Sequence, residues 1–304
     1  MDGDGGVKYG LPYLGSKSRI AEWVVSVLPP APVLVDLFAG GCAVTHAALL
    51  SGKWKRIICN DVTDTTQMFV DAIRGEYAGY SHVPDRAEFM AEKDADPAVR
   101  LMYSFGSNGI DYLWGNGIED VKVHASRMLS LPSTHERRME YREFIVALRR
   151  YLGDSGADNL TGKGVGQVHG LAELESLERL ESVERLQGLQ ALERLQALEL
   201  DYRNVVIPDG ATVYADPPYR GTNGGAYTWD DSQVEEFDAW LASVDFPVYV
   251  SEFTCPDGCV EVAHQKRTQS SAATVTQTVD EKIFVQERFY DTAKVPTLFD
   301  FDVD

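Results

Sequence analysis

The sequence is poor in the residues that build disulfide frameworks and metal sites. Its four cysteines, Cys42, Cys59, Cys255 and Cys259, are too few for a disulfide framework, and they lack the spacing and second ligand pair of a zinc site. The six histidines show no paired metal spacing either. We therefore expect reduced structural thiols and a protein that needs no metal.

Long apolar runs and basic charge are also scarce. No apolar stretch approaches the roughly 20 residues that span a bilayer, and the acidic, glycine-rich start lacks the basic and apolar parts of a secretory signal. These absences predict a soluble, cytoplasmic protein without a membrane partner. The formal net charge of -19 argues against a broadly basic nucleic-acid wrapper, so any DNA binding must be local.

Two common nucleotide-binding motifs are missing. The sequence has no Gly-x-Gly-x-x-Gly pattern, which makes a nicotinamide enzyme less favoured, and no Gly-Lys-Ser/Thr, which excludes an ordinary P-loop. An adenosyl cofactor without a pyrophosphate fits this chain better.

Apolar runs alternate with helical patterns at both ends of the chain. Strands are predicted at 33–35, 56–59, 211–215 and 247–251, and helices at 18–28, 44–50, 64–73 and 234–244. This order predicts an α/β fold, a parallel sheet with helices on both faces, interrupted by an insertion at 75–200. Within the insertion we expect a charged helix at 135–152 and a glycine-rich linker at 153–170.

Leucine or valine recurs at every third position from Leu171 to Leu198. An α-helix has 3.6 residues per turn, so these side chains would travel around a helix rather than share one face. A strand needs a period of two and a coiled coil one of 3.5. We therefore predict no ordinary helix here; a small solenoid and an expanded surface loop both remain open.

The tetrapeptide Asp216-Pro217-Pro218-Tyr219 directly follows a predicted strand, and ligands bind at the carboxyl ends of parallel strands. Such a motif could serve methyl transfer to an amino group on a nucleobase. That nitrogen is a poor nucleophile because its lone pair is delocalised into the ring, so the reaction requires hydrogen-bond acceptors. Asp216 and the Pro217 carbonyl would accept its two hydrogens, and Tyr219 would stack on the flipped base. The alternative interpretation is a rigid proline turn.

A glycine-containing turn, Asp36-Leu-Phe-Ala-Gly-Gly-Cys42, follows the first strand. Glycine lets the backbone approach a nucleoside closely, and Phe38 would lie near the cofactor. Asp61 ends the next strand about 20 residues later, the spacing at which an acidic side chain reaches the ribose hydroxyls of a nucleotide-like ligand. The alternative for Asn60-Asp61 is a helix N-cap.

Four elements occur in a fixed order. They are Tyr13-Leu-Gly15-Ser-Lys17, then Phe38-Ala39-Gly40-Gly41-Cys42 with acidic Asp36 and Asp61, then Asp201-Tyr202, then Asp216 to Tyr219. With the stretches 103–106, 109–114 and 281–287, they make the chain resemble the Dam-like, alpha-type family of N6-adenine DNA methyltransferases, and in detail its phage-encoded members. Cys42 departs from the last glycine of the family motif, and the leucine repeat departs from the bacterial members.

The resemblance implies a Rossmann-like, S-adenosylmethionine-dependent methyltransferase sheet formed by residues 1–74 and 201–304. A target-recognition region would occupy 75–200, including the leucine repeat at 171–200. The implied catalytic residues are Asp216, Pro217, Pro218 and Tyr219, and the implied cofactor-binding residues are Tyr13, Lys17, Asp36, Phe38, Ala39, Gly40, Gly41, Asp61 and Asp201. The implied partner is double-stranded DNA, bound by a monomer or weak dimer in the cytoplasm of a bacterial host.

Two other functions remain open at this point. Asp/Asn-Pro-Pro-aromatic motifs also serve methyltransferases that act on RNA or on a protein amide. A protein without catalytic activity could instead use the acidic repeat to recruit a partner or to mimic DNA.

Overall fold

The computed structural model describes residues 8–131, 134–153, 175–187, 189, 192–221, 228–270 and 276–291. The chain divides into two compact units. The first unit comprises Met1–Gly10, Gly15–Val70 and Leu189–Asp304, and the second comprises Leu11–Leu14 and Asp71–Gly188.

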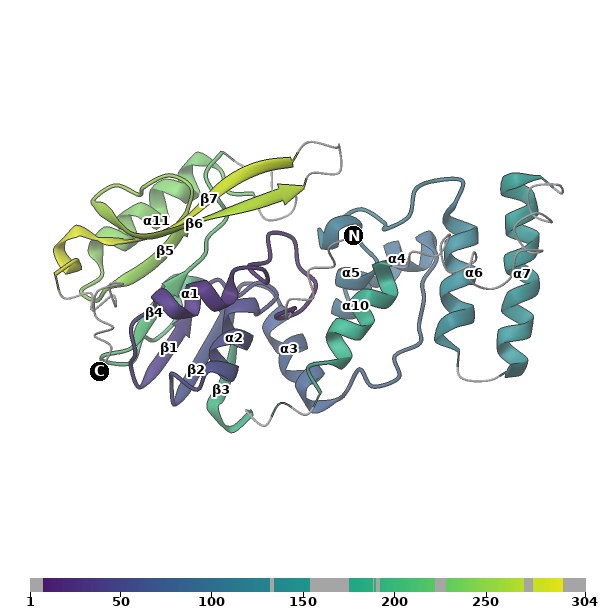
Figure 1. The fold of residues 1–304 in the computed structure, drawn as a ribbon, viewed down its shortest axis with the longest axis horizontal. Helices are drawn as coiled ribbons and strands as arrows, with labels where there is room; N and C mark the ends of the chain where they lie inside the picture. The colour runs from purple at the N-terminus through teal and green to yellow at the C-terminus, as the bar shows by residue number, and fades with distance from the viewer. Residues whose placement is uncertain are drawn as a thin grey trace, which may run out of the picture. The chain divides into compact units, whose positions relative to one another are not determined.

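The first unit is built on a seven-stranded sheet with the order β3-β2-β1-β4-β5-β7-β6 (Figure 1). Its strands are β1 (Val33–Asp36), β2 (Arg56–Asp61), β3 (Leu195–Glu199), β4 (Thr212–Ala215), β5 (Val248–Glu252), β6 (Cys259–Ser270) and β7 (Thr276–Gln286). The first five strands are parallel, and β7 runs antiparallel to both β5 and β6. The strand order reverses between β1 and β4, which is the switch point where doubly wound sheets bind ligands.

Helices cover both faces of this sheet, as alternate side chains of β1 show. Val35 packs in one core cluster with Phe237 and Leu241 of α11 (Asp231–Ser243). Asp36, the next residue, accepts a hydrogen bond from Thr45 of α2 (Ala43–Ser51), so it points to the opposite face. The remaining helical elements of this unit are α1 (Ala21–Val27), the start of α3 (Thr65–Arg74), and the 3₁₀ turns η2 (Leu192–Arg194), η3 (Tyr202–Asn204) and η5 (Glu287–Phe289). The predicted Rossmann-like α/β sheet with helices on both faces is confirmed.

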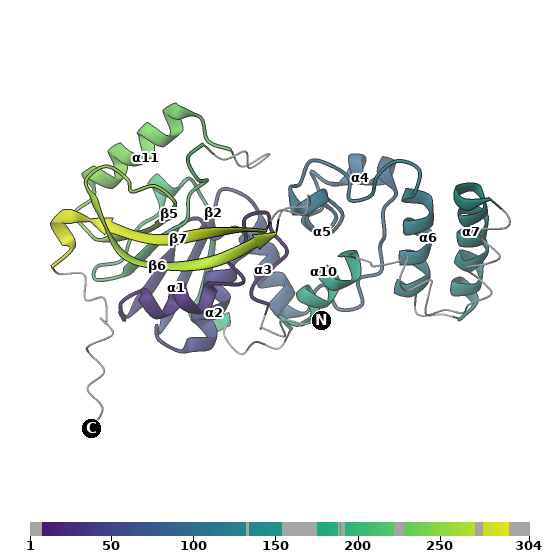
Figure 2. The same cartoon turned by 45° about the horizontal axis from the view of Figure 1, so that its top comes forward.

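The described part of the second unit is helical. It contains α4 (Arg86–Glu92), α5 (Pro97–Met102), η1 (Phe105–Ser107), α6 (Glu119–Ser130), α7 (Thr134–Leu152) and α10 (Glu175–Glu184). Helices α6 and α7 lie side by side and antiparallel (Figure 2), and α7 is the charged helix predicted from the sequence. After α5 the chain forms a short loop closed by a bridge between Ser104 and Tyr112.

The leucine repeat differs from what its period predicts. The prediction that no ordinary helix fits is wrong for α10, in which Leu180 and Val183 are buried, as is Leu186 in the turn that follows. A spacing of three falls about 60° short of a full turn, so these three positions spread over about 120°, which one apolar helix face accommodates. Residues 171–174, 188, 190 and 191 of the repeat lie outside the described residues, as does the predicted glycine-rich linker from residue 154 onwards.

The end of the same repeat forms β3, whereas the sequence predicted that residues up to 200 belong to the insertion. Leu195–Glu199 pair in parallel with Ile57–Asp61 of β2. The Arg194 guanidinium anchors the start of the strand by donating to the Leu49 carbonyl at 2.9 Å and the Trp54 carbonyl at 3.4 Å. Two further strands, β6 and β7, were not predicted either.

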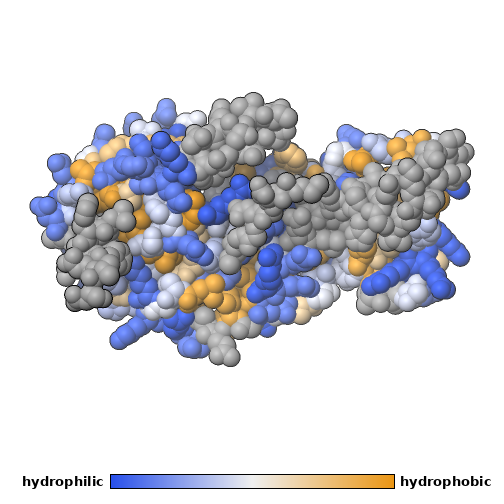
Figure 3. Space-filling model, viewed as in Figure 1, coloured by the Kyte–Doolittle hydropathy of each residue, from blue (hydrophilic) through white to orange (hydrophobic). Residues whose placement is uncertain are grey.

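Hydrophilic residues are spread over both units on the face drawn in Figure 3. Among the described residues, no helix combines the length and the apolar character needed to cross a membrane.

Candidate active site

Four predicted acidic residues lie at the same edge of the sheet. Asp36 ends β1, Asp61 ends β2, Asp201 follows β3, and Asp216 follows β4. Because these strands are parallel neighbours, their carboxyl ends share one edge. The sheet therefore brings together segments that are up to 180 residues apart in the sequence.

The turn after β1 is held by backbone and side-chain hydrogen bonds from the neighbouring strand. The Gly40 amide donates to Asp61 Oδ2 at 2.9 Å, and the Ala39 amide donates to the Asn60 carbonyl at 2.8 Å. Cys42, the last residue of this turn, has φ 59, in the left-handed region that favours glycine. A residue other than glycine thus adopts a left-handed backbone conformation at the end of the turn.

Gly10 packs against this turn, which the sequence analysis did not foresee. A Cβ on Gly10 would lie 2.3 Å from the Gly41 carbonyl oxygen, and the φ of Gly10 is +72. The Gly10 amide donates to His46 Nδ1 at 3.0 Å, and burial lowers the pKa of His46 to about 4, so the ring is a neutral acceptor. Only glycine fits this close approach.

Asp36 is almost completely buried, with 1% of its surface exposed. Its Oδ2 accepts a hydrogen bond from Thr45 at 2.8 Å, whereas Oδ1 has no hydrogen-bond partner among the residues that the structure describes. Burial raises the pKa of Asp36 to about 7, and the charges of Asp216 and Asp61 act in the same direction. An acceptor without a partner at the switch point suits the positively charged end of a ligand.

Asp61 and Asp201 already serve the loops beside them. Asp61 Oδ1 accepts from the Thr63 amide at 3.0 Å and the Thr63 hydroxyl at 2.7 Å. Asp201 caps η3 and forms an ion pair with Arg203 at 2.7 Å, which lowers the pKa of the Asp201 carboxyl. Each carboxylate retains lone pairs beyond these contacts.

Phe38 belongs to an aromatic cluster beside the turn. Its ring centroid lies 5.1 Å from that of Tyr202, 5.6 Å from Trp229 and 5.8 Å from Phe237. This packing fixes Phe38, which stays only partly buried, as an apolar wall near the ends of β1 and β4.

Asn60 is a further site residue, to which the sequence assigned no role. Its side-chain amide donates to the carbonyls of Leu37 and Leu200 at 3.0 and 2.9 Å.

Lys17 joins the two halves of the predicted site. Its ammonium lies 2.9 Å from Asp216 Oδ1 and 4.4 Å from the centroid of the Tyr219 ring, and its side chain is 8% exposed. Burial raises the pKa of Asp216 while the Lys17 charge lowers it. The sequence suggested a role for each residue separately, and the structure shows that they form one ion pair.

The Tyr219 ring is held by three different elements. Besides Lys17, Phe253 after β5 contacts it edge-on, with centroids 4.5 Å apart and an interplanar angle of 84°. The Tyr219 hydroxyl donates to Glu281 Oε2 of β7 at 2.9 Å. Glu281 falls within a stretch that carries the family resemblance, but no pattern in the sequence assigned it a role.

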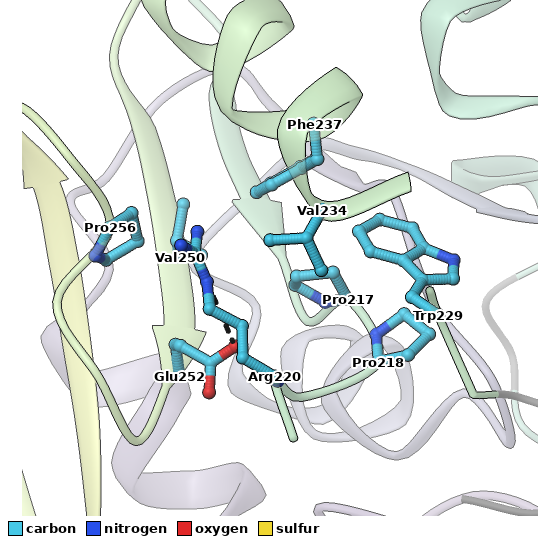
Figure 4. Close-up of a pocket in the computed structure, with 9 residues that line it drawn as sticks. All are labelled: Pro217, Pro218, Arg220, Trp229, Val234, Phe237, Val250, Glu252 and Pro256. Atoms are coloured by element: carbon cyan, nitrogen blue, oxygen red, sulfur yellow. Dashed lines mark hydrogen bonds and ion pairs between the residues drawn. The ribbon is translucent and has the colours of Figure 1, made fainter. Parts of the chain in front are cut away.

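A pocket lies beside the two prolines of the tetrapeptide (Figure 4). Its lining residues are Pro217, Pro218, Arg220, Trp229, Val234, Phe237, Val250, Glu252 and Pro256. Glu252 ends β5 and accepts a hydrogen bond from the Arg220 amide at 3.2 Å, and its carboxylate also lies 3.9 Å from Arg220 Nε. Arg220, the residue that follows the tetrapeptide, is therefore held at the end of β5 by Glu252.

Tyr13 falls in the second unit, whereas the other predicted site residues fall in the first. Among the described residues, no group of three or more His, Cys, Asp and Glu side chains could hold a metal ion.

The family model for D12 class N6 adenine-specific DNA methyltransferases matches residues 13–97. The match supports an adenine-specific DNA methyltransferase. It covers Lys17, the glycine turn and Asp61, and it implies a methyl donor, typically S-adenosylmethionine, and a DNA substrate. The expectation of DNA adenine methylation is confirmed.

Other comparisons add little. One matching solved structure is that of the rRNA methyltransferase aviRa from Streptomyces viridochromogenes, at 12% identity over 88% of this chain and 83% of that chain, with a TM-score of 0.30. The strand order, rather than this likeness, identifies the fold. No curated protein matches the chain.

Proposed function

We propose that the protein transfers a methyl group from S-adenosylmethionine to the N6 amino group of an adenine flipped out of double-stranded DNA. The observation that carries this proposal is the buried ion pair between Lys17 and Asp216, which links the family-matched segment to the tetrapeptide at the switch point of the sheet.

Residues at the ends of β1 to β3 fit the cofactor. Asp36 Oδ1, buried and without a described partner, is an acceptor for the ammonium of its methionine part. Asp61 would bind the ribose hydroxyls, and Phe38 and Asp201 would lie near the adenine ring. Ala39, Gly40 and Gly41 let the backbone approach closely, and Tyr13 and Lys17 would complete the contacts. When bound, S-adenosylmethionine supplies an electrophilic methyl group.

Asp216, Pro217 and Tyr219 would prepare the acceptor nitrogen. The Asp216 carboxylate and the Pro217 carbonyl each accept one amino hydrogen, which stabilises positive charge as it develops on nitrogen. Pro217 and Pro218 fix the direction of that carbonyl, because each proline restricts φ. One face of Tyr219 carries Lys17, so we place the stacked base on the opposite face.

We further propose that the chain is a Dam-like, alpha-type and phage-encoded enzyme, active as a monomer or weak dimer in the bacterial cytoplasm. Residues 1–74 and 201–304, together with β3 of the sheet, would form its catalytic domain, and the rest of 75–200 its target-recognition region. The position of the helical second unit between β2 and β3 in the sequence supports this arrangement.

Methylation of unmethylated host DNA with labelled cofactor, followed by digestion to nucleosides, tests the function. Labelled N6-methyladenine should form, and Asp216→Ala should reduce it by about 100-fold or more, the loss typical when a transition-state acceptor or donor is removed. Asp209→Ala, at an exposed loop residue, is the matched control and should keep full activity. Undiminished product with Asp216→Ala, or preferred labelling of RNA or protein in competition, would contradict the proposal.

A further inference from the structure

Glu281 is a carboxylate in an unusual place. It lies on β7, between β5 and β6, and only 1% of its surface is exposed. Burying a carboxylate costs free energy unless hydrogen bonds or charges compensate. The Tyr219 hydroxyl supplies one such contact, with its oxygen 2.9 Å from Glu281 Oε2.

This contact differs in kind from the other two on the Tyr219 ring. The Lys17 ammonium lies over the ring and Phe253 packs edge-to-face with it, so both contacts act on the π-system of the ring. A hydrogen bond to a carboxylate is directional and short. It also acts at the hydroxyl end of the ring, farthest from the backbone, where it controls tilt most strongly.

We propose that Glu281 is a positioning residue, which orients the Tyr219 ring so that a stacked adenine presents its amino group to Asp216 and the Pro217 carbonyl. This inference rests on the proposed function. Glu281 touches neither substrate nor cofactor in it, and it acts through the Tyr219 hydroxyl.

A second effect of Glu281 gives an independent readout. Its negative charge raises the pKa of Asp216, as burial does. Glu281→Gln keeps an acceptor oxygen for Tyr219 but removes the charge, so the pKa of Asp216 should fall. If methyl transfer needs ionised Asp216, the rise of kcat with pH should move to lower pH. A residue that only filled space would not produce this shift.

The test is a mutant cycle on the full chain with hypomethylated host DNA. Tyr219→Phe removes the hydroxyl that bonds to Glu281 and that also lowers the pKa of Asp216 by hydrogen bonding. Glu281→Leu and Tyr219→Phe should each lower kcat about tenfold, and the double variant should be no worse than Tyr219→Phe, because the Glu281 contact is already lost with the hydroxyl. Glu281→Gln should stay within about threefold of the parent at its optimum pH. Glu261→Gln, on the neighbouring β6, is the matched control and should change neither kcat nor the pH profile.

Calorimetric binding of S-adenosylmethionine verifies that each variant is folded. Multiplied losses in the double variant, or an unshifted pH profile in Glu281→Gln, would overturn the inference while leaving the methyltransferase function intact. If Glu281→Leu does not fold, the pH profile of Glu281→Gln still tests the inference. The shift of that profile to lower pH should occur both in the parent and in the Tyr219→Phe background. A parent protein that binds cofactor but methylates no DNA would overturn both proposals.

Discussion

Single buried carboxyl groups define the chemistry of the site, and Asp36 is the clearest case. Its pKa rises from 3.8 to about 7 because burial disfavours the charged form. The folded chain therefore holds a proton on Asp36 at pH values where the unfolded chain has released it. The stability that this proton confers is complete below pH 4 and is lost as the pH rises to about 7.

Replacing Asp36 with asparagine should remove this dependence, because the amide is neutral at every pH. Relative to the parent, Asp36→Asn should gain about 3 kcal/mol in free energy of unfolding between pH 5 and pH 8, at about 1.4 kcal/mol per pH unit up to pH 7. Urea denaturation of the cofactor-free protein at the two pH values measures this gain. Asp209→Asn, at an exposed position, should show no such change, and an equal offset for Asp36→Asn at both pH values would refute the prediction.

Site residues that belong to a short motif could be predicted from the sequence. Site residues that are defined only by tertiary packing could not. Lys17 and Asp216 follow from short motifs, although their ion pair does not. Asn60, Glu252 and Glu281 are buried polar residues at strand ends or within strands. In the sequence they look like ordinary polar positions, because their burial depends on segments that are distant along the chain.

Helices and strands also differ in whether the sequence predicts them. The central strands β1, β2, β4 and β5 are predictable, since strands buried on both faces read as continuous apolar runs. The long strands β6 and β7 pair with each other and carry many polar residues. They therefore lack the continuous apolar run from which a strand is predicted. Helix α10 and strand β3 escaped prediction because a period of three matches neither structure over its full length.

Helix α10 has a definite task in the second unit. Arg179 Nη1 donates to three carbonyls at the end of α5 and in the loop after it, those of Leu101, Met102 and Ser104, at 3.3, 2.8 and 2.8 Å. Backbone carbonyls at a helix end need such partners. Part of the leucine repeat thus supports the loop closed by Ser104 and Tyr112.

Arg179→Gln should loosen this loop, because the shorter amide cannot serve three carbonyls. Amide hydrogen exchange in peptides covering 101–114 should accelerate by about tenfold or more, equivalent to a loss of at least about 1.4 kcal/mol of local stability. Arg185→Gln is the matched control: in the described contacts its guanidinium bonds only to Glu181 and Ser182 of the preceding helix, so exchange in 101–114 should not change. Equal acceleration in both variants would contradict a specific role for Arg179.

For the whole molecule, the excess of acid limits how DNA can be held. A chain with 47 acidic and 28 basic residues carries a net negative charge, which repels phosphates. Contacts must therefore be few and grouped, as expected of an enzyme that releases each site after modification.

A salt titration of binding to non-specific duplex DNA tests this view. Each neutralised phosphate contributes about -0.9 to the slope of log K against log salt concentration, and we expect a slope of about -3 to -5 between 50 and 200 mM salt. Fluorescence anisotropy with a labelled duplex measures it. A slope steeper than about -7 would show an extensive basic footprint that the composition does not suggest.

The anchoring of β3 matters because the sequence of this strand occurs twice in the chain. The pentapeptide Leu-Gln-Ala-Leu-Glu of β3, 195–199, also occurs at 189–193, six residues earlier. An even shift keeps every side chain on its face, so the earlier copy offers β2 the same side chains as the true strand. The residue before each copy breaks this degeneracy: Gly188 precedes the first, whereas Arg194 precedes the second and binds the Leu49 and Trp54 carbonyls. The Arg194 guanidinium thus distinguishes the copy that forms the edge strand from the identical sequence six residues earlier.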